Sequence, residues 1–155
     1  MKPVFNKKAS FDYFLKERFE AGIRLTGAEV KSARAGAASL ADSFVKITRG
    51  EPILYGAYIS PYKYALDPSY DPKRERGLLL HSKEIDYLIG KLSSANLTIV
   101  PTKLYTSHNL AKLEIALASP KKKFDKRDSL KRKSLEKQTE SLLRADKLRA
   151  QKDSR

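Results

Sequence analysis

The amino-acid sequence predicts a mainly β protein with short helices, in which a small antiparallel barrel is followed by a basic tail. Three observations predict this class. Five to six short stretches between residues 13 and 118 have the features of strands and are separated by turns. Two other stretches carry helix caps or helical spacing of apolar residues. The last segment, residues 121–155, is strongly charged and poor in apolar side chains.

The first strand and the first helix follow a short N-terminal segment. Residues 1–12 have the composition of a loose basic arm. A strand is expected from Tyr13 to the bend at residues 22–23, where glycine suits a bulge or a barrel corner. Residues 26–29, Thr-Gly-Ala-Glu, form a capping box, in which the threonine hydroxyl and the glutamate carboxylate each accept a backbone N–H. Gly36 is expected to end this helix in the left-handed conformation.

A hairpin and a long connection are expected in the middle of the chain. Val45 and Ile47 alternate with polar or outward-facing residues along one strand, and a turn over residues 49–52 leads into a second strand over residues 53–59. Residues 60–77 then contain three prolines, three tyrosines and several basic residues. Structureless loops of this length are uncommon in compact domains and tend to be functional or disordered.

The second helix and the last strands lie between residues 78 and 118. A short buried strand over residues 78–80 precedes Ser82, which is expected to cap the helix, and Asn96 is expected to end it. Two final strands are expected, over residues 97–106 with a break at Pro101 and over residues 112–118. The apolar residues of the helix follow the i, i+3, i+4, i+7 spacing that covers a core: Ile85, Leu88, Ile89 and Leu92.

Short antiparallel strands with a helix plugging the set favour a closed barrel of the oligonucleotide-binding type, because that fold presents an exposed sheet and loops. We expect this barrel, with two helices, over residues 13–120, after the basic arm of residues 1–12. Residues 121–155 hold 14 basic and 6 acidic residues. This segment has too little apolar surface to offset its ordering entropy, but it is rich in helix formers. We therefore expect a basic C-terminal tail that is disordered when free and helical when bound.

Composition narrows the classes of function. The chain of 155 residues contains 32 Lys and Arg against 18 Asp and Glu, a net charge of +14, which indicates a polyanionic partner such as nucleic acid. The absence of cysteine excludes a disulfide framework, a zinc ribbon and thiol catalysis. No apolar run is long enough for a transmembrane helix, and the N-terminus lacks the apolar stretch of a signal peptide. We expect a cytoplasmic protein without a membrane partner.

Catalytic signatures are sparse, whereas signatures of RNA binding are frequent. The two histidines, His81 and His108, fall at different predicted locations and make no clear acid–base pair, and no glycine-rich phosphate loop occurs. We expect no enzyme, no cofactor and no metal site; a ribonuclease using one of the histidines remains the weaker alternative. Basic residues interleave with aromatic ones over residues 62–76, and Lys31 and Arg34 lie on the first helix. Phosphates need cations and unstacked bases need flat partners, so these residues are candidate RNA contacts.

A series of short motifs is more specific than any of these signals alone. The series comprises residues 19–23 (FEAGI), 25–32 (LTGAEVKS), 34–36 (RAG), 42–44 (DSF), 59–62 (ISPY), 71–76 (DPKRER), 78–81 (LLLH), 104–105 (LY) and 121–127 (KKKFDKR). Over residues 5–127, the order and spacing of these motifs resemble the small protein B family, the SsrA-binding proteins that accompany transfer-messenger RNA in bacteria.

The resemblance implies an adaptor without enzymatic activity. Members of this family bind the tRNA-like domain of transfer-messenger RNA and enter ribosomes stalled on messages that lack a stop codon. The tail would lie in the vacant mRNA channel near the small-subunit decoding centre, so that trans-translation resumes on the RNA's own template and the incomplete product is tagged for degradation. We expect a monomer in a 1:1 complex with this RNA. Composition alone equally permits another ribosome-associated RNA-binding barrel protein.

The resemblance also implies roles for single residues. Lys112 would contact phosphate, Glu20 would accept bonds from base or ribose donors or orient a neighbouring cation, and Leu79 would support the RNA-binding face by packing. Phe124 could stack on a base of the decoding centre. The basic residues on and just before the first helix are added to Lys112, Glu20 and Leu79. The RNA-binding candidates are then Glu20, Arg24, Lys31, Arg34, Leu79 and Lys112. The tail candidates are Lys121, Lys122, Phe124, Asp125, Lys126 and Arg127.

Overall fold

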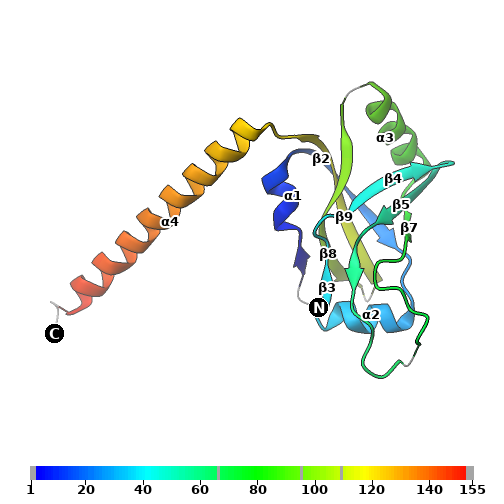
Figure 1. Cartoon of the computed structure of the whole chain (residues 1–155), viewed down its shortest axis with the longest axis horizontal. Coiled ribbons are helices and arrows are strands. Elements are labelled where there is room, and N and C mark those ends of the chain that lie inside the picture. The colour runs from blue at the N-terminus through cyan, green and yellow to red at the C-terminus, as the bar shows by residue number, and fades with distance from the viewer. Residues whose placement is uncertain (1–2, 66, 95, 109, 153–155) are drawn as a thin grey trace. The chain divides into compact units, whose positions relative to one another are not determined.

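Nine strands and three helices make up the described chain up to Pro120, in a computed structural model that describes residues 3–65, 67–94, 96–108 and 110–152 (Figure 1). The strands are β1 (Val4–Phe5), β2 (Tyr13–Ile23), β3 (Ala38–Ser39), β4 (Phe44–Thr48), β5 (Glu51–Tyr55), β6 (Tyr58–Ile59), β7 (Arg76–Leu79), β8 (Thr98–Ser107) and β9 (Leu110–Pro120). The helices are α1 (Lys7–Asp12), α2 (Gly27–Arg34), α3 (Ser82–Ser94) and α4 (Lys123–Lys152). The chain divides into two compact units, residues 1–120 and 121–155.

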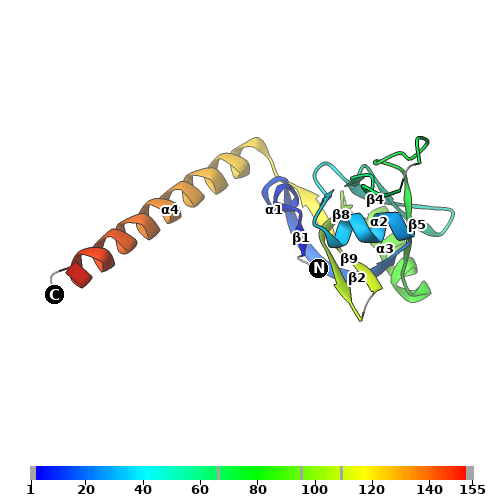
Figure 2. The same cartoon turned by 90° about the horizontal axis from the view of Figure 1, so that it is seen from below.

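The main sheet closes on itself. Its order is β1-β8-β4-β5-β7-β2-β9, its neighbouring strands pair antiparallel in the described residues, and β9 pairs with β8 as well as with β2. The strands from β8 round to β9 therefore form a ring, and β1 lies against β8 outside it. Figures 1 and 2 show α2 and α3 at opposite ends of this ring. The prediction of antiparallel strands with short helices is confirmed for this unit. The whole chain is a mixture of strands and helices rather than mainly β, because α4 alone spans 30 residues.

The inside of the ring holds the hydrophobic core. Leu113, Ile115 and Leu117 alternate along β9, in the last strand expected from the sequence, and are buried inside the ring. Ala116 and Ala118, which point the other way, are buried too. Ala118 packs with Ala9 of α1 in a second, smaller cluster on the outer surface of β9. Both side chains are single methyl groups, which lets α1 lie close to the strand. Each large side chain buried in this way contributes about 2 kcal/mol of stability.

The N-terminal residues differ from the loose arm that was expected. Residues 4–12 form β1 and α1, so that expectation is wrong for this stretch. The reason is Asn6, whose side-chain oxygen accepts the N–H of Ala9 at 3.1 Å and caps α1. Its amide nitrogen donates to the carbonyls of Leu40, at 2.8 Å, and Pro101, at 2.9 Å. A buried amide satisfied in this way fixes the N-terminal segment to the ring.

The N-terminal cap of α2 matches the prediction, whereas that of α3 does not. Both bonds of the α2 capping box are present, between Thr26 and Glu29, and Gly36 has a φ of +80° just after the helix. In α3 the cap is the residue before Ser82: the carbonyl of His81 accepts the N–H of Ile85 at 3.0 Å. Glu84 accepts the backbone N–H of His81 at 3.0 Å, so the expectation that Ser82 caps this helix is wrong. Leu88 of α3 is buried in the core, whereas Ile89 is 40% exposed and does not belong to the covered face.

The hairpin β4–β5 is present, but the strand expected over residues 53–59 is divided. Thr48 pairs with Glu51, and the two residues between them, Arg49 and Gly50, have φ values of 53° and 79°. Such values match the twist of a two-residue hairpin turn. Gly56 has a φ of +73°, and a Cβ there would lie 3.2 Å from the carbonyl oxygen of Asp42. The chain turns at this point into β6, which pairs with β3 in a second sheet.

The unit after Pro120 contains the single helix α4. Asp125 accepts the backbone N–H of Lys122 at 3.0 Å, and Glu140 pairs with Arg144 at 2.9 Å. The large apolar side chains described along this helix are more than half exposed: Phe124, Leu130, Leu135, Leu142 and Leu143. None of the helices in the described part of the chain is long and apolar enough to span a membrane.

Candidate nucleic-acid interface

The outer face of β7, β2, β9 and β8 brings four of the RNA-binding candidates onto one surface. Gly22 of β2 pairs with Leu79 on one side and with Lys112 on the other, and Lys112 pairs with Tyr105. Because side chains alternate along strands, residues two apart share a face. Ala21 and Ile23 are buried inside the ring, which leaves Glu20 on the outer face. We call this surface the sheet face: Glu20, Arg24, Leu79, Tyr105 and Lys112.

Gly22 and Gly77 give the sheet face its shape. A Cβ on Gly22 would lie 3.2 Å from the Cβ of Leu79, so the leucine covers the bare strand at this point. Leu79 is nevertheless 51% exposed. Likewise the side chain of Arg24 lies across Gly77, with Cδ at 3.4 Å from an ideal Cβ position. The predicted packing role of Leu79 therefore has a physical basis, since it contacts the strand and still presents an apolar surface to solvent.

Lys112 and Tyr105 both bond to Glu20. The Lys112 ammonium forms an ion pair with one carboxylate oxygen of Glu20, and the Tyr105 hydroxyl donates to the other. Hydrogen bonds from Lys112 and then Tyr105 lower the pKa of Glu20. Burial, followed by the bond to Glu20, raises the pKa of Tyr105 to about 12. Glu20 is therefore an anion that holds a cation in place, which favours the cation-orienting role among those considered for it.

A groove continues from the sheet face toward the N-terminal segment. The Lys103 ammonium lies 4.7 Å from the ring centre of Tyr105 and 5.5 Å from that of Phe5. Across the groove, Arg18 pairs with Glu114 at 3.3 Å. Its lining is formed by Phe5, Asn6, Lys7, Ser10, Leu15, Arg18, Thr102, Lys103 and Glu114. This mixture of cations and rings can contact a phosphate backbone and its bases.

The remaining two RNA-binding candidates lie on a different element. Lys31 and Arg34 belong to α2, at one end of the ring (Figure 1). The Lys31 ammonium lies 5.2 Å from the ring centre of Tyr62 in the connection that follows β6. The candidates thus form two groups, one on the sheet face and one on α2.

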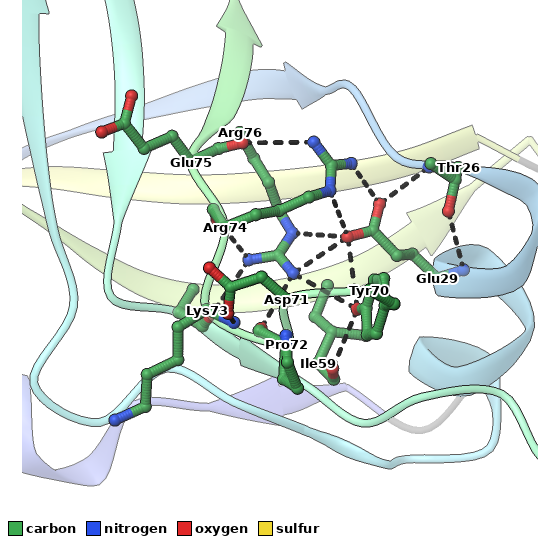
Figure 3. Close-up of polar contacts among 11 residues, drawn as sticks. Thr26, Glu29, Ile59, Tyr70, Asp71, Pro72, Lys73, Arg74, Glu75 and Arg76 are labelled. Atoms are coloured by element: carbon green, nitrogen blue, oxygen red, sulfur yellow. Dashed lines mark hydrogen bonds and ion pairs between the residues drawn. The ribbon is translucent and has the colours of Figure 1, made fainter. Parts of the chain in front are cut away.

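A buried ion network joins α2 to the end of the long connection (Figure 3). Glu29 is 1% exposed and receives Arg74 Nε at 2.8 Å and Arg76 Nε at 3.0 Å. Arg76 is fully buried and also donates to the carbonyl of Ala57 at 2.7 Å. Tyr70 donates to the carbonyl of Ile59 at 2.9 Å. This network fixes residues 70–76 against the helix, so these two arginines serve the fold.

The charge of Glu29 is stabilised despite its burial. Burial alone would raise the pKa of this carboxyl. Hydrogen bonds from Arg74 and from the backbone of Thr26, together with the charge of Arg76, outweigh burial and lower the pKa. Sequence reasoning missed this network, because it interpreted the arginines of residues 71–76 as part of a family motif and a basic stretch. The capping box around Glu29 was the one local signal of a buried carboxylate.

The tail candidates lie at the start of the second unit. Lys121 and Lys122 precede α4, and the rest of the motif forms its first two turns. Asp125 accepts a backbone N–H in this first turn, where a negative charge favours a helix N-terminus. Phe124 is 72% exposed. The aromatic ring is therefore accessible in the position at which stacking on a base was expected.

Comparison with known proteins decides the family. The model of the SmpB protein family matches residues 4–145. The chain belongs to the SmpB family. An SsrA-binding protein from Sulfurihydrogenibium sp. (strain YO3AOP1) is 53% identical over 135 residues, covering 87% of this chain and 89% of the relative. An SsrA-binding protein from Rubrobacter xylanophilus is 48% identical over 139 residues, covering 90% of this chain and 93% of the relative.

A solved structure agrees with this assignment to the SmpB family. It is described as "tmRNA-SmpB: a journey to the center of the bacterial ribosome" and is 38% identical to this chain, with a TM-score of 0.67. The match covers 84% of this chain and 95% of that one. The resemblance found in the sequence motifs is thereby confirmed.

The two histidines of this SmpB-family chain lie on separate elements. His81 is exposed, and its backbone caps α3. His108 is exposed in the turn between β8 and β9, with a φ of 48°, and its Nδ1 lies 3.1 Å from the hydroxyl of Ser107. Within the described residues, no group of three or more His, Asp or Glu is placed to hold a metal ion. These contacts give each histidine a local role in a cap or a turn.

Proposed function

We propose that this chain is a non-enzymatic RNA-binding adaptor of trans-translation. It binds the tRNA-like domain of SsrA, the transfer-messenger RNA, and delivers this RNA to stalled ribosomes in the bacterial cytoplasm. Membership of the SmpB family carries the proposal, since the curated relatives are named SsrA-binding proteins. The solved relative, described as tmRNA-SmpB in the bacterial ribosome, supports the same partners.

The ring of strands supports a finer description of the fold. An antiparallel sheet that closes on itself, with short helices at its ends, is what an oligonucleotide-binding-type barrel requires. We assign this barrel to residues 13–120, and the N-terminal segment 1–12 adds basic side chains beside it. The chain binds as a monomer, one copy to each RNA.

The sheet face is the proposed main contact with RNA. Its exposed leucine and its half-buried tyrosine and lysine offer an apolar patch, a hydroxyl and a cation side by side. Such a combination suits folded RNA, whose recognition relies on shape, 2′-hydroxyls and phosphates. The residues proposed to bind RNA are Glu20, Arg24, Lys31, Arg34, Leu79 and Lys112.

The tail is proposed to probe the empty mRNA channel near the decoding centre. Leu130, Leu135, Leu142 and Leu143 are exposed and the charge of the tail is high, so packing among these side chains does little to stabilise a helix. We propose that it is disordered in the free protein and becomes helical when a polyanionic channel neutralises its charge. The residues proposed to contact the ribosome are Lys121, Lys122, Phe124, Asp125, Lys126 and Arg127.

Deletion of residues 121–155 tests this division of labour. The core is formed within residues 1–120, so the truncated chain should fold and bind the tRNA-like domain within about twofold of the full chain. Tagging of a nascent peptide on a ribosome stalled without a stop codon should be abolished. Equal loss of RNA binding and of tagging would overturn the division into two parts.

Recovery of bound RNA from cells separates this function from its alternative. An SsrA-binding adaptor should recover one dominant tRNA-like species when the full chain is purified from a bacterium. Recovery of ribosomal RNA alone would instead favour another ribosome-associated RNA-binding barrel protein. The recovered RNA should be intact, because an adaptor has no cleavage step.

A further inference from the structure

The long connection between β6 and β7 is anchored on both sides of its tip. At its start, the N–H of Ser60 donates to the carbonyl of Ala37 at 2.9 Å, and the N–H of Ile59 donates to that of Pro72 at 3.0 Å. Toward its end, Arg74 and Arg76 bond to Glu29 (Figure 3). The tip is thus held beside α2 by the fold.

This tip presents two tyrosines. The N–H of Ala65 donates to the carbonyl of Tyr62 at 2.9 Å and closes a turn, which leaves Lys63 and Tyr64 at the central positions. The two tyrosine rings lie 5.6 Å apart with an angle of 66° between their planes. Tyr64 is 74% exposed, the largest value among the exposed large apolar and aromatic side chains described. The Tyr64 ring therefore does not serve to fill the core of the fold.

Each of these rings has a cation next to it. The Lys31 ammonium lies 5.2 Å from the centre of Tyr62, and the Lys63 ammonium lies 5.5 Å from that of Tyr64. Asp67, three residues after Tyr64, accepts hydrogen bonds from the backbone N–H and the hydroxyl of Ser69. Its carboxylate is therefore satisfied within the loop. We name the two rings and two cations the tyrosine platform: Lys31, Tyr62, Lys63 and Tyr64.

We propose that the tyrosine platform binds an unpaired RNA nucleotide, with the base stacked on Tyr64 and the phosphate contacting Lys31 or Lys63. A nucleotide carries a flat base and an anion within one unit, which matches two rings beside two cations. An acidic peptide would supply only the anion. This inference rests on the proposed RNA-binding function. It adds a second RNA-binding site, separate from the sheet face, whose ligand is single-stranded RNA.

The test uses the full chain and a ten-nucleotide RNA that carries one 2-aminopurine. Stacking on an aromatic ring quenches the fluorescence of this base, whereas electrostatic attachment to the basic tail does not. Tyr64→Ala should abolish the quenching and weaken the stacked complex about tenfold, and Tyr64→Phe should retain both. Lys63→Ala should keep the quenching and reduce the salt slope by about 0.7. Thermal unfolding checks that each variant is folded.

Tyr87 provides a matched control. It also has a lysine near its ring, with Lys91 at 5.3 Å, but it lies on α3 at the other end of the ring of strands (Figure 1). Tyr87→Ala should leave the quenching unchanged. Equal loss in Tyr64→Ala and Tyr87→Ala, or no loss in either, would overturn the inference. Failure of the unmodified chain to bind the tRNA-like domain would count against the proposed function instead.

Discussion

At the scale of single residues, partners decide what each charge can do. Arg76 and Lys112 are both basic, yet one is fully buried on Glu29 and the other lies at the surface on Glu20. A count of charges treats these two residues alike. In this chain the first stabilises the fold, and the second remains a candidate for phosphate contact.

Glu29→Gln should lower the free energy of unfolding by about 3 kcal/mol, because it leaves the buried Arg76 without its counter-charge. Urea denaturation at neutral pH measures this loss. Because the pKa of Glu29 is lowered in the fold, its stabilising contribution is complete above the ordinary value of 4.5 and decreases as the pH falls further. The difference between the two proteins should therefore shrink below that pH, since a protonated Glu29 resembles glutamine.

A glutamate outside the network serves as the control for this variant. Glu20 has a side chain that is 48% exposed, and its ion pair with Lys112 is at the surface. Glu20→Gln should therefore change the free energy of unfolding by less than about 1 kcal/mol. A loss as large as that of Glu29→Gln would mean that burial does not distinguish the two ion pairs.

Glu20 and Lys112 should act on RNA as one unit. Lys112→Ala should weaken binding to the tRNA-like domain about tenfold, by removing a charge-assisted contact with phosphate. Glu20→Gln should weaken it about threefold, and the double variant should bind like Lys112→Ala alone, because Glu20 works by positioning the ammonium. Fluorescence anisotropy at a fixed salt concentration measures all four proteins. Additive losses would show that Glu20 contacts the RNA itself.

At the scale of elements, the sequence predicted those caps and turns that depend only on neighbouring residues. The capping box of α2 and the turn of the β4–β5 hairpin are set by residues within a few positions of one another, so the sequence identifies them. The alternation of Leu113, Ile115 and Leu117 likewise indicates which face of β9 is covered. Four RNA-binding candidates share the sheet face because strand register places them there, although the family resemblance alone selected three of them, Glu20, Leu79 and Lys112.

Elements that depend on distant partners were missed. The cap of α1 gains two bonds to the carbonyls of Leu40 and Pro101, which no local pattern reveals. The break after β5 is caused by the backbone of Asp42 close to Gly56. In the Glu29 network, Arg74 follows the glutamate by 45 positions and Arg76 follows it by 47. Sequence spacing therefore indicates neither the burial of Glu29 nor the arginines that pair with it.

The tail offers a prediction about an isolated element. A peptide of residues 121–155 should be mostly coil in dilute buffer, because its exposed leucines cannot pack and pairs such as Glu140–Arg144 contribute only about 0.3–0.5 kcal/mol. Addition of polyphosphate should raise its helix content, measured by circular dichroism. Leu135→Pro should prevent that rise, since proline breaks a helix interior. A fully helical spectrum without polyanion would contradict the proposed transition.

At the scale of the whole molecule, the charge is divided between two units for which we propose different tasks. Residues 121–155 carry a net +8, more than half of the total of +14, whereas the core within the ring is built from residues of the first unit. The remaining net charge of +6 belongs to the unit that holds the sheet face and the tyrosine platform. A basic composition alone would place RNA binding on the tail, whereas we propose that the ring carries the main RNA-binding surface.

The salt dependence of binding distinguishes these assignments. If about six phosphates of the tRNA-like domain are contacted, log K should fall with log salt at a slope near −5. The full chain and residues 1–120 should give the same slope within about one unit, because the contacts belong to the ring. Lys112→Ala should flatten the slope by about one unit in both. A slope that collapses when the tail is removed would mean that the tail carries the phosphate contacts, and the sheet face would then lose its role as the main RNA-binding surface.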